Sequence, residues 1–132
     1  MRVKYIVVFA LLILLFGIAL PVSGDKKYPG EDDFVIVDKQ AQMKMEVPPV
    51  YPDSARVNNI EGIVWIKALV DENGIVINAK VVKCTKKNYG FEQAALDAAK
   101  KCEYLPATQN DKPVAIWVTY KVVFALAVGT GK

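Results

Sequence analysis

Residues 62–76, GIVWIKALVDENGIV, hold two extended segments joined by a turn, and this pattern decides the fold. Side chains alternate along residues 62–70, as they do in a β-strand with one buried face. The inward face is small and aliphatic: Val64, Ile66, Ala68 and Val70. Residues 71–74, DENG, favour a tight turn because Asn73 and Gly74 both tolerate positive φ. The sequence therefore predicts a β-hairpin with an apolar core face.

The second strand of this hairpin, residues 75–84 (IVINAKVVKC), alternates less regularly than the first. Three consecutive apolar residues open it. This pattern leaves two interpretations: the strand has two buried faces, or a β-bulge lies near Asn78.

Residues 91–102, FEQAALDAAKKC, are typical of a short amphipathic helix. The apolar face consists of Phe91, Ala95, Ala98 and Cys102. Glu92 lies near the start and Lys100 and Lys101 near the end, where the helix dipole favours these charges. Pro106 prevents a continuation of the helix. We expect this helix to pack on the sheet through its alanines.

The third and longest predicted strand is residues 114–126, VAIWVTYKVVFAL. Every second side chain is apolar or aromatic, which is the period of a strand with one buried face. These residues are Ile116, Val118, Tyr120, Val122, Phe124 and Leu126.

Length and composition limit the classes of function that the chain can have. A chain of 132 residues that is 53% hydrophobic is typical of one globular domain. Arg2 and Lys4 account for two of the 17 basic residues, and the remaining 15 nearly balance 14 acidic residues. This balance argues against nucleic-acid binding. The chain has no histidine to activate Ser23 or Ser54, so we expect no enzyme, catalytic residue, metal site, cofactor or small-molecule substrate.

The N-terminus predicts export. Residues 1–24 combine a basic start, an apolar run from about residue 5 to 20, Pro21, and the small-residue site Val22-Ser23-Gly24. We interpret them as a signal peptide cleaved after Gly24; the alternative is a short N-terminal membrane anchor. Residues 25–47 form a charged, turn-rich leader or linker, in which residues 34–46 favour a brief extended segment. The domain is predicted at residues 48–128, and the Pro48-Pro49 pair marks its beginning.

Three segments together resemble the C-terminal domain of TonB-type energy transducers: YPDSARVNNIEGIVWIKALVDENGIV (51–76), FEQAALDAAKKCEYLPA (91–107) and KPVAIWVTYKVVF (112–124). The resemblance implies an α+β fold of β-β-α-β order, in which one helix covers one face of a three-stranded antiparallel sheet. It places the first strand in the middle and the last at an edge. It also implies a periplasmic location and an envelope-protein partner of the class of TonB-dependent outer-membrane transporters.

In that family the edge strand binds an extended peptide, the TonB box of a transporter, by adding it to the sheet. The resemblance thus implies a peptide-binding site at Ala115, Trp117, Thr119, Lys121, Val123, Tyr51 and Pro52. Sheet edges do accept strands unless charge or cover prevents it, and Lys121 is the only charged residue between Ala115 and Leu126. The alternative is that residues 34–46 of the same chain cover this edge.

The two tryptophans allow three interpretations. Trp65 and Trp117 fall on the odd-numbered faces of neighbouring predicted strands. They could form an exposed aromatic pair for a partner, pack under residues 34–46, or stabilise the sheet as a cross-strand pair.

The sequence also departs from the full transducer. It has no histidine, Val50 stands where the family has a glutamine before Tyr-Pro, and residues 25–47 span at most ~80 Å when extended. We therefore expect a free-standing exported domain. An alternative function is a structural or interaction domain of the envelope without a transporter partner, and a homodimer is possible.

Cys84 and Cys102 are predicted to be free thiols, although an exported chain with two cysteines invites a disulfide. The helix rises 1.5 Å per residue and carries Cys102 roughly 16 Å back along the sheet from the end where Cys84 lies. A disulfide needs Cα atoms within about 7 Å.

Overall fold

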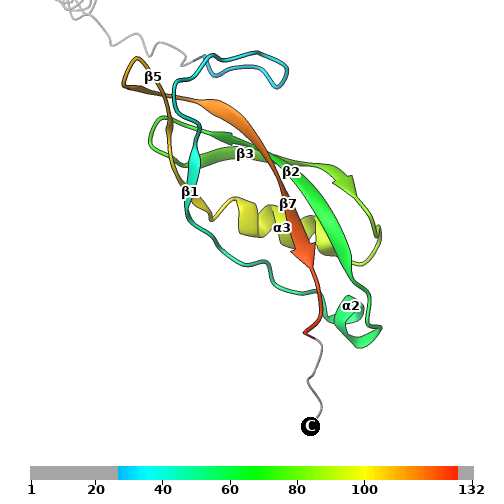
Figure 1. Cartoon of the computed structure of the whole chain (residues 1–132). Helices are drawn as coiled ribbons and strands as arrows, with labels where there is room; N and C mark the ends of the chain where they lie inside the picture. The colour runs from blue at the N-terminus through cyan, green and yellow to red at the C-terminus, as the bar shows by residue number, and fades with distance from the viewer. Residues whose placement is uncertain (1–26, 128–132) are drawn as a thin grey trace, which may run out of the picture.

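Three nine-residue strands form the central sheet of the computed structural model, which describes residues 27–127. The predicted signal peptide, residues 1–24, lies outside the described residues. Figure 1 shows the elements, which follow one another as β1 (Gln42–Met45), α2 (Asp53–Val57), β2 (Gly62–Val70), β3 (Val76–Cys84), α3 (Phe91–Ala99), β4 (Glu103–Leu105), β5 (Ala107–Gln109), β6 (Lys112–Val114) and β7 (Ile116–Phe124).

The central sheet has the order β3-β2-β7, and both strand pairs are antiparallel. The predicted α+β fold is therefore confirmed, with the first strand of the hairpin in the middle and the last strand at an edge. Helix α3 packs on one face of this sheet, against β2 and β3 (Figure 1). The predicted inward residues of β2 are fully buried beneath it: Val64, Ile66, Ala68 and Val70.

The hairpin turn is organised by Asp71, whose side chain is buried. Its Oδ1 accepts hydrogen bonds from the backbone N–H groups of Asn73 (2.8 Å) and Ile75 (2.9 Å). Of the two residues predicted to tolerate positive φ, Gly74 adopts it (79°) and Asn73 does not. A Cβ on Gly74 would lie 1.8 Å from the carbonyl oxygen of Tyr104, so this turn packs directly against β4.

Strand β3 is irregular, which decides between the two interpretations of its sequence. Its pairing with β2 shifts between Asn78 and Val76, beside the predicted bulge, and shifts again between Lys83 and Val81. The bulge interpretation is confirmed, and a second bulge lies further along the strand.

Two short sheets flank the central one. β1 pairs with β4, β5 pairs with β6, and Lys39 forms an isolated bridge with Thr108 of β5. Residues 34–46 thus extend as predicted only in their last part, and they pair with β4 and β5. The backbone bonds of this segment lead to β4 and β5 rather than to β7, so the alternative that residues 34–46 cover the β7 edge stays a prediction.

Two predicted boundaries are corrected. Helix α3 ends at Ala99 rather than at residue 102, because the N–H groups of Lys101 and Cys102 bond three residues back and tighten the last turn. The last strand begins at Ile116, since Lys112–Val114 belongs to the β5-β6 hairpin.

Both cysteines are free and buried, as the predicted helix direction requires. The Cys102 sulfur lies 3.4 Å from the backbone nitrogen of Val47, whereas the Cys84 sulfur lies 3.3 Å from the carbonyl oxygen of Lys86. Within residues 27–127, no helix is long and apolar enough to cross a membrane.

Candidate peptide-docking edge

Strand β7 forms a smooth edge of the central sheet. Each of its nine residues pairs with β2 in one continuous register, from Ile116 opposite Val70 to Phe124 opposite Gly62. Among the described residues no strand pairs with the other side of β7. An edge of this kind presents a row of unpaired N–H and C=O groups, which can accept a further strand.

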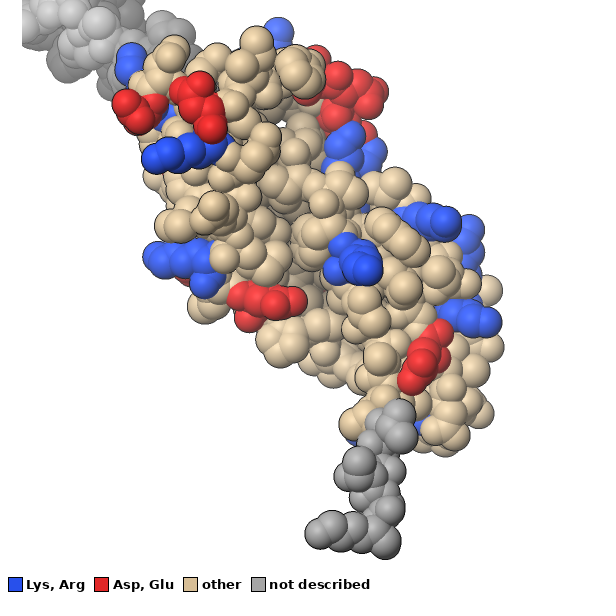
Figure 2. Space-filling view, in the orientation of Figure 1, with Lys and Arg blue, Asp and Glu red and all other residues tan. Residues whose placement is uncertain are grey.

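The opposite edge of the sheet, β3, has the features that block strand addition. Its two bulges interrupt the ladder, and Lys80 and Lys83 add charge to it. Figure 2 shows basic side chains gathered on the side where β3 ends. The single charged residue of β7 is Lys121. The two edges therefore differ in both regularity and charge, and β7 is the edge suited to accept a strand.

The predicted site residues fall into two groups. Four of them project from β7 on the face of the sheet away from α3: Trp117, Thr119, Lys121 and Val123. The last three are exposed and Trp117 is half-buried. Ala115 is buried just before β7 begins. Tyr51 and Pro52 lie on the other side of the sheet, at the end of β7, so the structure does not bring all seven residues together.

Tyr51 packs as part of the core. Its ring meets the rings of Phe91 and Phe124 edge-on, with centroids 5.7 Å apart in both pairs. Its hydroxyl donates a 2.6 Å hydrogen bond to the carbonyl oxygen of Ile60. Burial raises the pKa of Tyr51, and the charge of Glu61 raises it further. Pro52 lies beside it as the N-cap of α2. These contacts hold Tyr51 against the aromatic core near Phe124, the last residue of β7.

The leader crosses the sheet face that lies away from α3. Trp117 Nε1 donates a 2.9 Å hydrogen bond to the carbonyl oxygen of Pro29, and Lys67 Nζ donates a 2.6 Å bond to that of Glu31. The Glu31 carboxylate also accepts a hydrogen bond from Lys80 of β3, which lowers the pKa of Glu31. One short segment thus contacts all three strands.

The two tryptophans are not cross-strand neighbours. Trp65 lies opposite Lys121, whereas Trp117 lies opposite Leu69. Lys67 stands 5.8 Å from the centre of the Trp117 ring, and Lys83 stands 5.1 Å from that of Trp65. The alternative of a cross-strand Trp65–Trp117 pair is therefore wrong, because the antiparallel register places neither residue opposite the other. Each ring contacts a lysine instead.

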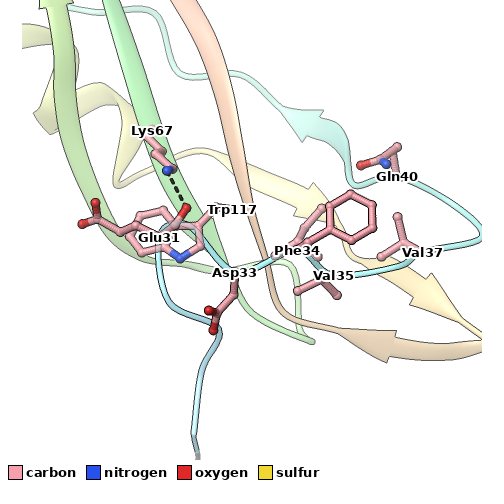
Figure 3. A pocket seen from close by; sticks show the side chains of 9 residues that line it. Glu31, Asp33, Phe34, Val35, Val37, Gln40, Lys67 and Trp117 are labelled. Atoms are coloured by element: carbon pink, nitrogen blue, oxygen red, sulfur yellow. Dashed lines mark hydrogen bonds between the residues drawn. The ribbon is translucent and has the colours of Figure 1, made fainter.

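A pocket of about 250 Å³ lies between the leader and the start of β7 (Figure 3). Phe34, Val35 and Val37 line it from the leader, and Ile116 and Trp117 line it from β7. Sequence reasoning placed these leader residues at the edge only as an alternative, in which residues 34–46 cover it. The one available signal is the FVIV run at residues 34–37, whose alternation says nothing about its neighbour.

The described part of the chain contains no cluster of three or more histidine, cysteine, aspartate or glutamate residues that could hold a metal ion.

Comparison with known proteins identifies the family. The profile of the family described as Gram-negative bacterial TonB protein C-terminal matches residues 47–126. Protein TonB of Xanthomonas campestris pv. campestris (strain B100) is 38% identical over 79 residues, which cover 60% of this chain and 35% of that protein. Protein TonB of Vibrio cholerae serotype O1 is 30% identical over 92 residues, which cover 70% and 37%. This chain thus aligns with about a third of the length of these curated relatives.

The fold comparison agrees. The solution NMR structure of the Pseudomonas aeruginosa TonB CTD superposes with a TM-score of 0.57 at 24% identity, covering 68% of this chain and 90% of that one. Since the matched family profile spans more than half of the sequence, this chain belongs to the TonB C-terminal domain family.

Proposed function

We propose that this domain is a non-enzymatic binding module of the periplasm that docks an extended peptide of an envelope protein at β7. The peptide class is the TonB box of an outer-membrane transporter, and it adds to the sheet as a fourth strand. Family membership supports a role linked to envelope transport. The observation that carries the proposal is the difference between the two sheet edges: β7 is continuous and weakly charged, whereas β3 is bulged and basic.

Strand addition assigns separate roles to backbone and side chains. The unpaired backbone of β7 supplies hydrogen bonds for any extended peptide, so it provides affinity without sequence preference. Thr119, Lys121 and Val123 project from one face of the edge strand and would contact alternate side chains of the peptide. Trp117 lies under the leader at the beginning of the same row. These residues would provide sequence preference.

Amide hydrogen exchange tests this proposal. The full chain is mixed with synthetic TonB-box peptides of outer-membrane transporters, and exchange is followed by mass spectrometry or NMR. We expect a peptide that binds to slow exchange at amides of Ile116–Phe124, because those that face outward gain partners. Strand β3 is the internal control, and its amides should exchange as in the free protein. Protection confined to β3, or binding that leaves β7 unprotected, would contradict the proposal.

A further inference from the structure

Residues 33–37 form an arch that is tied to the domain at both ends. On one side, Trp117 and Lys67 hold the carbonyl groups of Pro29 and Glu31. On the other side, Asp38 N–H donates a 2.8 Å hydrogen bond to the carbonyl oxygen of Thr108, and Asp38 Oδ2 accepts a 2.6 Å bond from the N–H of Asn110. The backbone between these ties makes no strand pairing. The arch is thus held in place without being part of a sheet.

The pocket lies between this arch and the beginning of β7. In Figure 3 the side chains of Phe34 and Val35 lie on the side of β7 that faces away from β2. An added strand would run along that side, about 4.8 Å from β7. Where it passed Ile116, it would enter the space between β7 and the arch. The arch therefore faces the proposed path of the peptide.

The pocket has a mixed lining, in which the polar residues are Glu31, Asp33, Gln40 and Lys67, and the feature that favours an apolar group is Phe34. Phe34 is apolar and 91% exposed, so it has little contact with the rest of the domain. The charged groups at the rim already have partners: Lys67 bonds to the Glu31 carbonyl group, the Glu31 carboxylate accepts a bond from Lys80, and Asp33 Oδ2 accepts a 2.7 Å bond from the N–H of Gly30. The volume of about 250 Å³ is below the roughly 300–1,000 Å³ of small-molecule sites. It fits a side chain rather than a cofactor.

We propose that the arch is the second wall of the docking site, and that the pocket receives a bulky apolar side chain at the end of the docked peptide that lies beside Ile116. This inference rests on the proposed strand addition at β7. Phe34 and Val35 of the leader then contribute to peptide specificity together with Trp117. Because both ends of the arch are already tied, little chain entropy is lost when the peptide enters, which favours binding.

The test compares two substitutions in the arch, measured by peptide fluorescence anisotropy on the full chain. Phe34→Ser removes the pocket wall. Ile36→Ser is the matched control, since Ile36 is 64% exposed on the same segment but does not line the pocket. We expect Phe34→Ser to weaken binding of a TonB-box peptide about tenfold, as the loss of a buried aromatic contact does. Ile36→Ser should change binding by less than about twofold.

A peptide series completes the experiment. Each apolar residue of the peptide is replaced by serine in turn. The replacement at the end of the peptide that lies beside Ile116 should weaken binding to the wild-type chain. The same replacement should change the affinity for the Phe34→Ser variant little. If wild-type protein binds with protection of β7, yet Phe34→Ser binds as tightly or more tightly, the inference is overturned and the arch only flanks or obstructs the edge.

Two other outcomes distinguish failure of the proposed function from failure of this inference. If no peptide protects β7 in the wild-type chain, the proposed function itself fails, irrespective of Phe34. If Phe34→Ser reduces self-association in analytical ultracentrifugation and leaves peptide binding unchanged, the pocket is a contact between two copies of the chain. That result also overturns the inference.

Discussion

The indole Nε1 of Trp117 donates a 2.9 Å hydrogen bond to the carbonyl oxygen of Pro29, 88 positions earlier in the chain. This contact joins the edge strand β7 to the leader that precedes the domain. The leader in turn reaches β2 through Lys67 and β3 through Lys80. The edge proposed to dock a peptide and the segment proposed to wall that site are therefore directly connected.

Removing the Trp117 hydrogen bond should loosen the leader. In Trp117→Phe the aromatic ring remains but its N–H donor is lost, and a hydrogen bond of this kind contributes about 1 kcal/mol. We expect proteolytic cleavage within residues 30–37 to become about fivefold faster, because the detached state becomes more populated. Limited proteolysis followed by mass spectrometry measures this rate. Trp65→Phe is the control, and equal rates in the two variants would contradict the assigned role of Trp117.

The attachment of the leader should also depend on pH. The hydrogen bond and charge of Lys80 lower the pKa of Glu31 from its ordinary value of 4.5. The ionised form is thus favoured in the folded state, so its contribution is present above pH 4.5 and is lost as the pH falls through the lowered pKa.

Glu31→Gln provides the comparison. Cleavage within residues 30–37 should be faster in Glu31→Gln than in the wild type at pH 7, and the two rates should converge once the pH falls below the lowered pKa of Glu31. A difference that persists unchanged at acidic pH would show that the charge of Glu31 does not hold the leader.

The hairpin turn should tolerate no side chain at Gly74. Gly74 combines a φ of 79° with close packing against the carbonyl group of Tyr104. We expect Gly74→Ala to lower the free energy of unfolding by about 2 kcal/mol or more, through both backbone strain and overpacking. Urea denaturation measures this change. Gly30→Ala is the control, because its Cβ would meet only the movable side chain of Asp33. Equal stabilities for both variants would contradict the turn geometry.

The two cysteines should be chemically free. Their sulfur atoms have different neighbours, Val47 and Ala98 for Cys102 and Lys86 for Cys84. Alkylation of the unfolded, unreduced protein should therefore add two groups, as measured by mass spectrometry. Native protein should react slowly because both thiols are buried. A product that carries no alkyl group would demonstrate a disulfide.

The central sheet could be predicted because each of its elements is specified by residues that are close together in the sequence. Alternation in β2, the Gly74 turn and the alanine face of α3 each fix one element, and the family resemblance supplies their order. The short strands β4, β5 and β6 escaped prediction, as did the pairing of β1, whose residues lie in the predicted extended segment. Each has only three or four residues, which is too short for a periodic pattern, and their pairing depends on contacts distant in sequence.

The candidate site was predictable only in part. The exposed row of β7 follows from the period of two, whereas the position of Tyr51 in the aromatic core depends on Phe91 and Phe124. The leader contacts are made by the backbone carbonyl groups of Pro29 and Glu31. A carbonyl group belongs to every residue, so no sequence pattern marks it.

Cysteine cross-linking between β7 and a docked peptide tests strand addition most directly. Val123 on β7 and Val82 on β3 are matched, since they are 52% and 56% exposed on opposite edges. Val123→Cys and Thr119→Cys are combined with TonB-box peptides that each carry one cysteine, and disulfide formation is measured. The native Cys84 and Cys102 are buried and provide little background.

Because paired strands advance together, the preferred peptide positions for Val123→Cys and Thr119→Cys should lie about four residues apart. Val82→Cys should form no preferred disulfide. That pattern is the result we predict. Equal cross-linking from Val82→Cys, or one and the same peptide position captured by both β7 variants, would contradict docking by strand addition at β7.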